Sequence, residues 1–272
     1  MAISEFAKNY HEKMFPERTH NNQQSSANQP EDSSTSTAAP FAQTDPEFIE
    51  FFDNFAFDEV VNERGQELDD KTRFMAILAT LLGCLGIDEF KVMLKPAMNF
   101  GVTPVEIKEI TYQATAYLGI GRVYPFLLAV NEVFQAEGVK LPLEAQGSTN
   151  PENRREAGTQ AQVDIFGKGM KDFWKSGSEE VRHINRWLAS NCFGDYYTRS
   201  GLDFKQREMV TFCFLAAQGG CEPQLTSHAA ANMKIGNNKA FLISVVSQCL
   251  PYIGYPRSLN AIACINKAAE SA

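Results

Sequence analysis

Four residues near the end of the chain combine a carboxylate, a thiol, an amide and an imidazole at helical spacing. Glu208 lies one turn into an apolar segment that ends at Gly219-Gly220. Cys221 then opens the next helix, and His228 follows two turns later on the same face, with Gln224 between them. A carboxylate and an imidazole can relay protons, and a helix N-terminus favours a thiolate. These four residues are our candidate site.

Each of these residues also fits a purely structural role. His228 could be a hydrogen-bonded core histidine, Cys221 a small buried apolar residue, and Glu208 a partner of Arg207. Arg257 could pair within the fold or hold a substrate anion. The spacing of histidine, cysteine and carboxylate matches no zinc pattern, so we expect no metal and no cofactor.

The elements that position these residues are predicted to be helices throughout. Segments 71–86 and 205–218 are apolar on nearly every side, which is typical of helices at the centre of a bundle. Thr103-Pro104-Val105-Glu106 is a capping box with proline at the first helical position, and Asp203 to Gln206 is a similar start. No convincing pair of alternating strands is present. The predicted fold class is all-α.

The chain contains two degenerate copies of one repeat. A shift of 135 residues superimposes six identical residues, and the apolar pattern shifts with them. The identical pairs are Gly101 and Gly236, Gln113 and Gln248, Tyr117 and Tyr252, Gly119 and Gly254, Arg122 and Arg257, and Asn131 and Asn266. Upstream, Lys71-x-Arg73-x-Met75 matches Lys205-x-Arg207-x-Met209 at a shift of 134. The chain is a tandem duplication.

Polar segments divide the chain into four parts. We expect an N-terminal helix and a flexible linker over 1–45, a first repeat over 46–143, a linker over 144–160 and a second repeat over 161–272. The N-terminal helix is amphipathic, with Ile3, Phe6, Tyr10 and Met14 at helical spacing, and should dock on a surface such as a neighbouring subunit.

The first repeat lacks the ionisable residues of the second. Phe74 stands in the place of Glu208. Ile87 or Asp88 falls near the position of Cys221, and Met93 or Leu94 falls near that of His228. We therefore expect one active site per chain, built by the second repeat, with the first repeat as a structural wall.

Composition narrows the classes of partner. The 272 residues carry a net charge of −8 without a cluster of Lys and Arg, which argues against nucleic-acid binding. No apolar segment is long enough to span a membrane, and the N-terminus lacks the apolar core of a signal peptide. We expect a cytoplasmic protein with reduced thiols.

The second-repeat pattern resembles that of the carboxymuconolactone decarboxylase family, which includes the alkylhydroperoxidase D-type peroxidases. Glu208, Cys221-Glu-Pro-Gln-Leu-x-x-His228 and Pro251-Tyr-x-Gly-Tyr-Pro-Arg257 carry the resemblance. It implies a compact all-α bundle that assembles into trimers or hexamers, so two repeats in one chain imply a homotrimer that imitates a hexamer. In the peroxidase branch a second cysteine stands where this chain has Gln224.

The resemblance implies three functions in order of preference. The first is a cofactor-free lyase acting on a small carboxylated lactone, with His228 transferring the proton, Glu208 orienting it, Cys221 and Gln224 shaping a polar wall and Arg257 available for a substrate carboxylate. The second is a thiol-dependent peroxidase with Cys221 as the reacting thiolate. The third is a non-catalytic helical oligomer that binds a small ligand.

Overall fold

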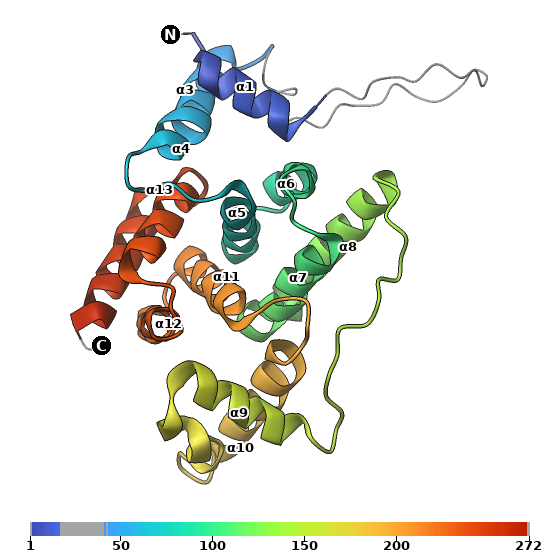
Figure 1. Cartoon of the computed structure of the whole chain (residues 1–272), viewed down its shortest axis with the longest axis vertical. Coiled ribbons are helices and arrows are strands. Elements are labelled where there is room, and N and C mark those ends of the chain that lie inside the picture. The colour runs from blue at the N-terminus through green and yellow to red at the C-terminus, as the bar shows by residue number, and fades with distance from the viewer. Residues whose placement is uncertain (1, 17–40, 42, 271–272) are drawn as a thin grey trace.

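The structure is a computed structural model that describes residues 2–16, 41 and 43–270. These residues form helices and no strand, which confirms the predicted all-α class. Figure 1 shows α5 (Asp70–Cys84) and α11 (Phe204–Gln218) side by side at the centre of the molecule. One of these two central helices comes from each repeat.

The other helices surround this central pair. Those of the N-terminal half are α1 (Glu5–Met14), α3 (Pro46–Asn54), the π-helix η1 (Phe55–Glu59), α4 (Val60–Asn62), α6 (Ile87–Asn99), α7 (Pro104–Leu118) and α8 (Ile120–Ala136). Those of the C-terminal half are α9 (Arg154–Phe166), the 3-10 helix η2 (Lys168–Lys175), α10 (Arg182–Trp187), the π-helix η3 (Leu188–Tyr197), α12 (Glu222–Lys234) and α13 (Lys239–Glu270). The backbone of α13 leaves helical geometry at Gly254.

The central helices are buried on every side, as their apolar sequences predict. Every residue from Arg73 to Gly83 is buried in α5, and every residue from Arg207 to Ala217 is buried in α11. The two backbones approach so closely that a Cβ added at Gly83 would lie 2.6 Å from the carbonyl oxygen of Phe214. Both predicted capping boxes are present, at Thr103 and at Asp203.

A pair of crossed hydrogen bonds ties the two repeats together. Arg73 donates through Nε to Oε1 of Gln248, and Arg207 donates through Nη1 to Oε1 of Gln113, both at 2.8 Å. The two arginines match each other in the repeat, and so do the two glutamines. Both arginine side chains are fully buried. The duplication seen in the sequence is therefore a structural one, in which each repeat supplies the glutamine that the other needs.

The N-terminal helix docks on its own chain rather than requiring a neighbouring subunit. Tyr10 stacks on Phe100 and Phe57, and its hydroxyl accepts a hydrogen bond from Arg73 at 2.9 Å. Met14 is fully buried against the same surface. The predicted flexible linker over 21–45 lies largely outside the described residues.

The second polar segment is more ordered than its composition predicts. Helix α9 begins at Arg154 and so crosses the expected boundary between 160 and 161. Glycines allow this helix to lie directly on η3, because a Cβ at Gly158 would fall 1.9 Å from the carbonyl oxygen of Ala189. Polar residues cover the outer face while Ala161 and Ile165 are buried, and this packing offsets the entropy that a polar linker would keep.

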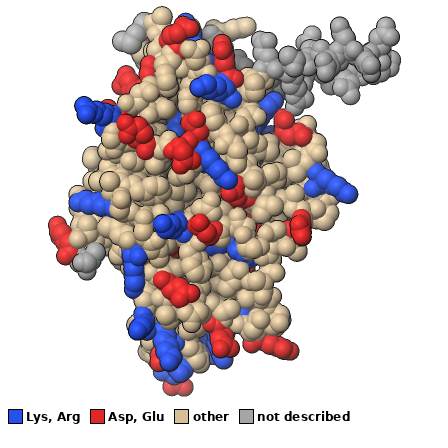
Figure 2. Space-filling model, in the orientation of Figure 1, with Lys and Arg blue, Asp and Glu red and all other residues tan. Residues whose placement is uncertain are grey.

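The surface of the molecule is mixed in charge. Figure 2 shows Lys and Arg interspersed with Asp and Glu over the face in view, without a large area of one sign. Among the described residues, no helix is both long and apolar enough to cross a lipid bilayer.

Candidate active site

Glu208 and His228 form a buried ion-pairing couple between α11 and α12. The Oε2 atom of Glu208 lies 2.7 Å from Nδ1 of His228. The Glu208 side chain has no exposed surface, and that of His228 is 11% exposed. Glu208 lies on the second turn of α11 and His228 on the second turn of α12, so the packing of these two helices sets the distance. Burial strengthens such a pair by excluding competing water.

Hydrogen bonds to Glu208 fix the proton positions of the couple. The hydroxyl of Tyr197 donates to Oε1 of Glu208 at 2.8 Å. With both carboxylate oxygens engaged as acceptors, Nδ1 of His228 is the donor in the second bond. The remaining ring nitrogen, Nε2, has no hydrogen-bond partner among the described residues. His228 therefore presents Nε2 as the atom that can exchange a proton with a substrate.

A chain of hydroxyl groups extends the network beyond the carboxylate. The hydroxyl of Tyr197 lies 2.7 Å from that of Tyr117 and 2.8 Å from that of Thr211. Thr211 in turn accepts from Nε2 of Gln113 at 2.8 Å. Burial and the nearby Glu208 raise the pKa of both tyrosines well above the usual value, so both remain protonated. Tyr117 and Gln113 come from the first repeat, which thus contributes to the second repeat's site.

Aromatic rings enclose the imidazole of His228. Tyr117 and Phe166 meet it edge-on, with ring centroids at 5.6 and 5.3 Å. Tyr117 belongs to α7 and Phe166 ends α9, so three separate elements hold one ring. These contacts leave His228 little freedom to rotate, and the apolar surroundings favour proton transfer over exchange with bulk water.

Asn232 fixes the helix that carries His228 against the helix that carries Glu208. Its Nδ2 donates to the backbone oxygens of Glu208 and His228, at 2.9 and 2.8 Å. Its Oδ1 accepts from Asn237, which also donates to the carbonyl oxygen of Lys205. The backbone of the couple is thereby held at both ends.

Cys221 lies apart from this couple. Its thiol contacts the carbonyl oxygen of Leu215 at 3.4 Å and Nε2 of Gln218 at 3.7 Å. No hydrogen bond joins it to Glu208 or His228 within the described part of the chain. Burial raises the pKa of the thiol, so the helix N-terminus does not yield the thiolate that the sequence suggested.

The two candidate substrate-binding residues also lie outside the hydrogen-bonded network. Gln224 is exposed on the first turn of α12. Arg257 is half-buried at the ends of the central helices, where its charge lowers the pKa of Cys84 and its Nε lies close to Gly219. It makes no ion pair with any described residue. Its repeat partner Arg122 donates to Gln218, so both arginines face a central helix end.

The first repeat has no equivalent of the couple. Phe74 is fully buried and stacks on Phe100, with ring centroids 5.0 Å apart. Met93 and Leu94 are fully buried apolar residues. Among the described residues, no cluster of three or more His, Cys, Asp and Glu side chains could hold a metal ion.

Sequence reasoning missed the hydroxyl groups that support Glu208. Tyr117 carried a signal, because its recurrence as Tyr252 in the second repeat marks a position that matters to the fold or the site. Tyr197 lies in an aromatic and charged segment, Phe193 to Arg199, that suits a pocket mouth. Thr211 carried no signal, since one threonine in an apolar helix is common.

Comparisons with known proteins agree with this architecture. The family model described as the carboxymuconolactone decarboxylase family matches residues 46–132 and 183–267, one segment in each repeat. A 4-carboxymuconolactone decarboxylase of Acinetobacter baylyi is 31% identical over 93 residues, which make up 34% of this chain and 68% of that protein. The same aligned residues are half as large a share of this chain, so the relative is about half as long, close to one repeat.

A solved structure shows the same fold over almost the whole chain. It is described as a gamma-carboxymuconolactone decarboxylase subunit of Burkholderia xenovorans and superimposes with a TM-score of 0.53. The match covers 87% of this chain and 92% of that chain, at 19% sequence identity.

Proposed function

Because this chain belongs to the carboxymuconolactone decarboxylase family, we propose that it is a cofactor-free lyase that releases CO₂ from a small carboxylated lactone. The observation that carries the proposal is the buried couple of Glu208 and His228, whose Nε2 atom is free for a substrate. The relative from Acinetobacter baylyi acts, by its name, on 4-carboxymuconolactone. That compound is therefore the first substrate to test.

In this proposal His228 is the proton donor. When the bond to the departing carboxylate breaks, its electron pair moves into the conjugated lactone and leaves as CO₂ the carbon that carried it. The imidazolium of His228 delivers the proton from Nε2 to the carbon of the resulting anion. The neutral ring then takes a proton from water, and the cycle closes without an oxidant or reductant.

Glu208 is the positioning residue of the mechanism. Its Oε2 holds Nδ1 of His228, so the proton that leaves always comes from Nε2. Its negative charge stabilises the imidazolium before transfer. Tyr197 orients the carboxylate from the opposite side. Arg257 and Gln224 are candidates to hold the substrate, since Arg257 makes no ion pair with a described residue and Gln224 is exposed on the same helix as His228.

The decisive experiment follows the loss of 4-carboxymuconolactone and the release of CO₂ in the purified protein. His228→Ala and Glu208→Gln should lower kcat by about 10²–10⁴-fold, the range of general acid–base catalysis, with an unchanged circular-dichroism spectrum. His183→Ala is the matched control, because His183 packs on Trp187 in α10, away from the couple, and should retain full turnover. Equal turnover in wild type and His228→Ala would contradict the proposal.

The same assay separates the peroxidase alternative. The raised pKa of the Cys221 thiol and its distance from the couple do not favour a reacting thiolate. Cys221→Ser should therefore retain lactone decarboxylation. Consumption of an organic hydroperoxide that Cys221→Ser abolishes would favour the peroxidase instead, and no turnover of either substrate would favour the ligand-binding oligomer.

We also propose that the chain forms a homo-oligomer, for which a trimer is the expected state. Exposed apolar side chains recur at matching places in both repeats: Ile120 and Tyr124 on α8, and Tyr255 and Leu259 on α13, are 54–65% exposed. A shift of 135 residues superimposes the two pairs. Such apolar stripes suit an interface between copies. Light scattering on the full chain tests this, and a monomer mass would contradict it.

A further inference from the structure

A cavity of about 540 Å³ lies apart from the candidate active site. Its walls come from α7, from α8, from the segment 141–146 that leads toward α9, and from Arg199 after η3. Neither Glu208 nor His228 lines it. Tyr117, which touches His228, follows the cavity residue Lys108 by nine residues on α7, about 13 Å along the helix. The cavity is thus a separate site of a size that suits a small ligand.

Lys108 is a buried cation in the wall of this cavity without a counter-charge. Its residue is 7% exposed, and its Nζ donates to Oδ1 of Asn131. Its other close neighbours are the rings of Tyr112 and Phe134, each with its centroid 5.8 Å from Nζ. No carboxylate pairs with it among the described residues. Burial accordingly lowers the pKa of Lys108.

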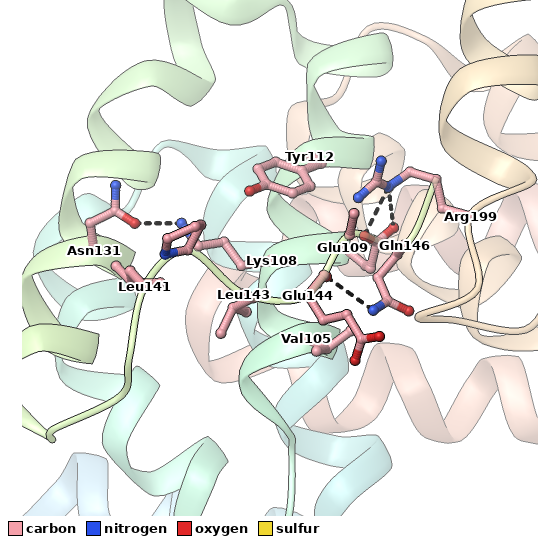
Figure 3. Close-up of a pocket in the computed structure, with 12 residues that line it drawn as sticks. Val105, Lys108, Glu109, Tyr112, Asn131, Leu141, Leu143, Glu144, Gln146 and Arg199 are labelled. Carbon is pink, nitrogen blue, oxygen red and sulfur yellow. Dashed lines mark hydrogen bonds and ion pairs between the residues drawn. The ribbon is translucent and has the colours of Figure 1, made fainter. Parts of the chain in front are cut away.

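The acidic residues of the cavity are engaged elsewhere. Glu109 is fully buried and binds both Arg199, at 2.9 Å, and Arg207, at 3.1 Å. One carboxylate shared by two guanidinium groups leaves a positive charge on that wall. Figure 3 shows the carboxylate of Glu144 pointing away from Lys108, and Tyr112 lying between Lys108 and Arg199. The ring of Tyr112 lies 5.4 Å from the guanidinium carbon of Arg199.

The rest of the cavity wall is apolar. It consists of side chains from α7 and from the segment before α9, namely Val105, Leu141, Pro142, Leu143 and Ala145. Hydrogen bonds hold that segment in place, because Gln146 accepts from the backbone nitrogen of Ser200 at 3.1 Å and Ser148 donates to Thr198 at 2.6 Å. The segment is therefore a fixed wall, and an apolar ligand body can pack on it.

We propose that this cavity binds a small organic carboxylate with an apolar body, whose charged end pairs with Lys108 and whose body packs against Leu141 and Leu143. A carboxylate supplies the counter-charge that Lys108 lacks, and the apolar wall favours a hydrocarbon body over a bare inorganic anion. The inference goes beyond the decarboxylation proposed for Glu208 and His228.

The second repeat shows that the fold does not need the lysine. A shift of 135 residues places Ile243 at the position of Lys108, on α13. An apolar side chain thus occupies the equivalent place in the same architecture. Lys108→Met should therefore fold, and the lysine is free to serve a ligand.

Benzoate is the probe, and isothermal titration calorimetry of the full chain measures its binding. Lys108→Met should raise the dissociation constant at least about tenfold, the effect of losing a charged hydrogen bond. Lys140→Met is the matched control, since Lys140 is exposed and lies just before the cavity segment, and it should leave binding within about twofold. Benzyl alcohol, which is similar in size but neutral, should bind at least about tenfold more weakly than benzoate.

Methyl NMR locates the bound probe. Benzoate should shift the signals of Leu141 and Leu143, and Ala145→Trp should weaken binding by filling the cavity without changing any charge. The proposal is overturned by an absence of saturable benzoate binding, by equal affinity in Lys108→Met, or by shifts confined to residues around His228. His228→Ala should retain the shifts at Leu141 and Leu143, so this result is independent of the proposed catalysis.

Discussion

The two repeats of this chain share a frame and differ in what that frame holds. Arg73 and Arg207 occupy matching places on the central helices, and each hydrogen-bonds a matching glutamine from the other repeat. The second repeat adds Glu208 to this frame, where the first repeat has the apolar Phe74. The comparison teaches that the cross-repeat bonds belong to the fold, whereas the ionisable couple is an addition that the fold can lose.

The carboxyl groups of the two repeats differ in the same way. Glu208 receives hydrogen bonds on both oxygens. In the first repeat, Oε1 of Glu89 is buried without a partner, and burial raises the pKa of Glu89 to about 7 and that of Asp53 to about 6. The second repeat provides for its charge, and the first repeat favours the protonated, neutral form.

The largest effect is expected from placing the second repeat's carboxylate in the first repeat. Phe74→Glu should lower the free energy of unfolding by about 3–5 kcal/mol, because a fully buried carboxylate would lack a cationic partner there. Urea unfolding measures it. Phe74→Leu is the control for lost packing, and a loss for Phe74→Glu no larger than for Phe74→Leu would show that the first repeat can still hold a charge.

A smaller effect is expected in the pH dependence of stability. The folded pKa values of Asp53 and Glu89 lie above their model values of 3.8 and 4.5, so the folded protein binds more protons than the unfolded chain. The contribution of each group is fully present below about pH 4 and is lost as the pH rises toward about 7, by about 2 kcal/mol per group. Urea unfolding between these two pH values measures the loss.

Neutral variants identify the groups responsible. Glu89→Gln and Asp53→Asn should each flatten the pH dependence. Glu59→Gln, at an exposed position of η1, should follow the wild type. A pH dependence that survives in the double variant of Asp53 and Glu89 would assign the effect to other groups.

The smallest effect distinguishes the two matched tyrosines. Tyr117→Phe removes a hydrogen bond to Tyr197 and should lower the free energy of unfolding by about 1 kcal/mol. Tyr252→Phe removes a buried hydroxyl that has no partner in the described structure, and should be neutral or stabilising. Thermal unfolding of the two variants compares them. Equal destabilisation would mean that Tyr252 has a partner after all, such as a buried water.

The residues that announced the fold were those with a local rule. Thr103 and Asp203 start helices through side chains that bond their own backbone three residues on, and this can be deduced from sequence alone. The apolar surfaces of α5 and α11 predicted their central place. The polar segment that holds α9 was misjudged, because the closeness of Gly158 to η3 depends on a partner that is distant in the chain.

The site was predictable in part for the same reason. His228 and Glu208 were found through spacing and residue type, and the structure joins them. Cys221 had the same local signals but packs against Leu215, so its thiol is desolvated instead of activated. Tyr197 and Thr211 escaped notice because a hydroxyl acquires its role only from the atom it meets.

The sequence by itself determined the helices, their caps, the duplication and the presence of a carboxylate and an imidazole in one repeat only. These follow from short-range backbone chemistry and from hydrophobic periodicity, which neighbouring residues set. The tertiary structure alone decided which hydroxyl groups support Glu208, that Cys221 stays apart, and that Lys108 faces a cavity without a counter-charge. Burial and electrostatic partners depend on chain segments about a hundred residues apart, such as Gln113 and Arg207.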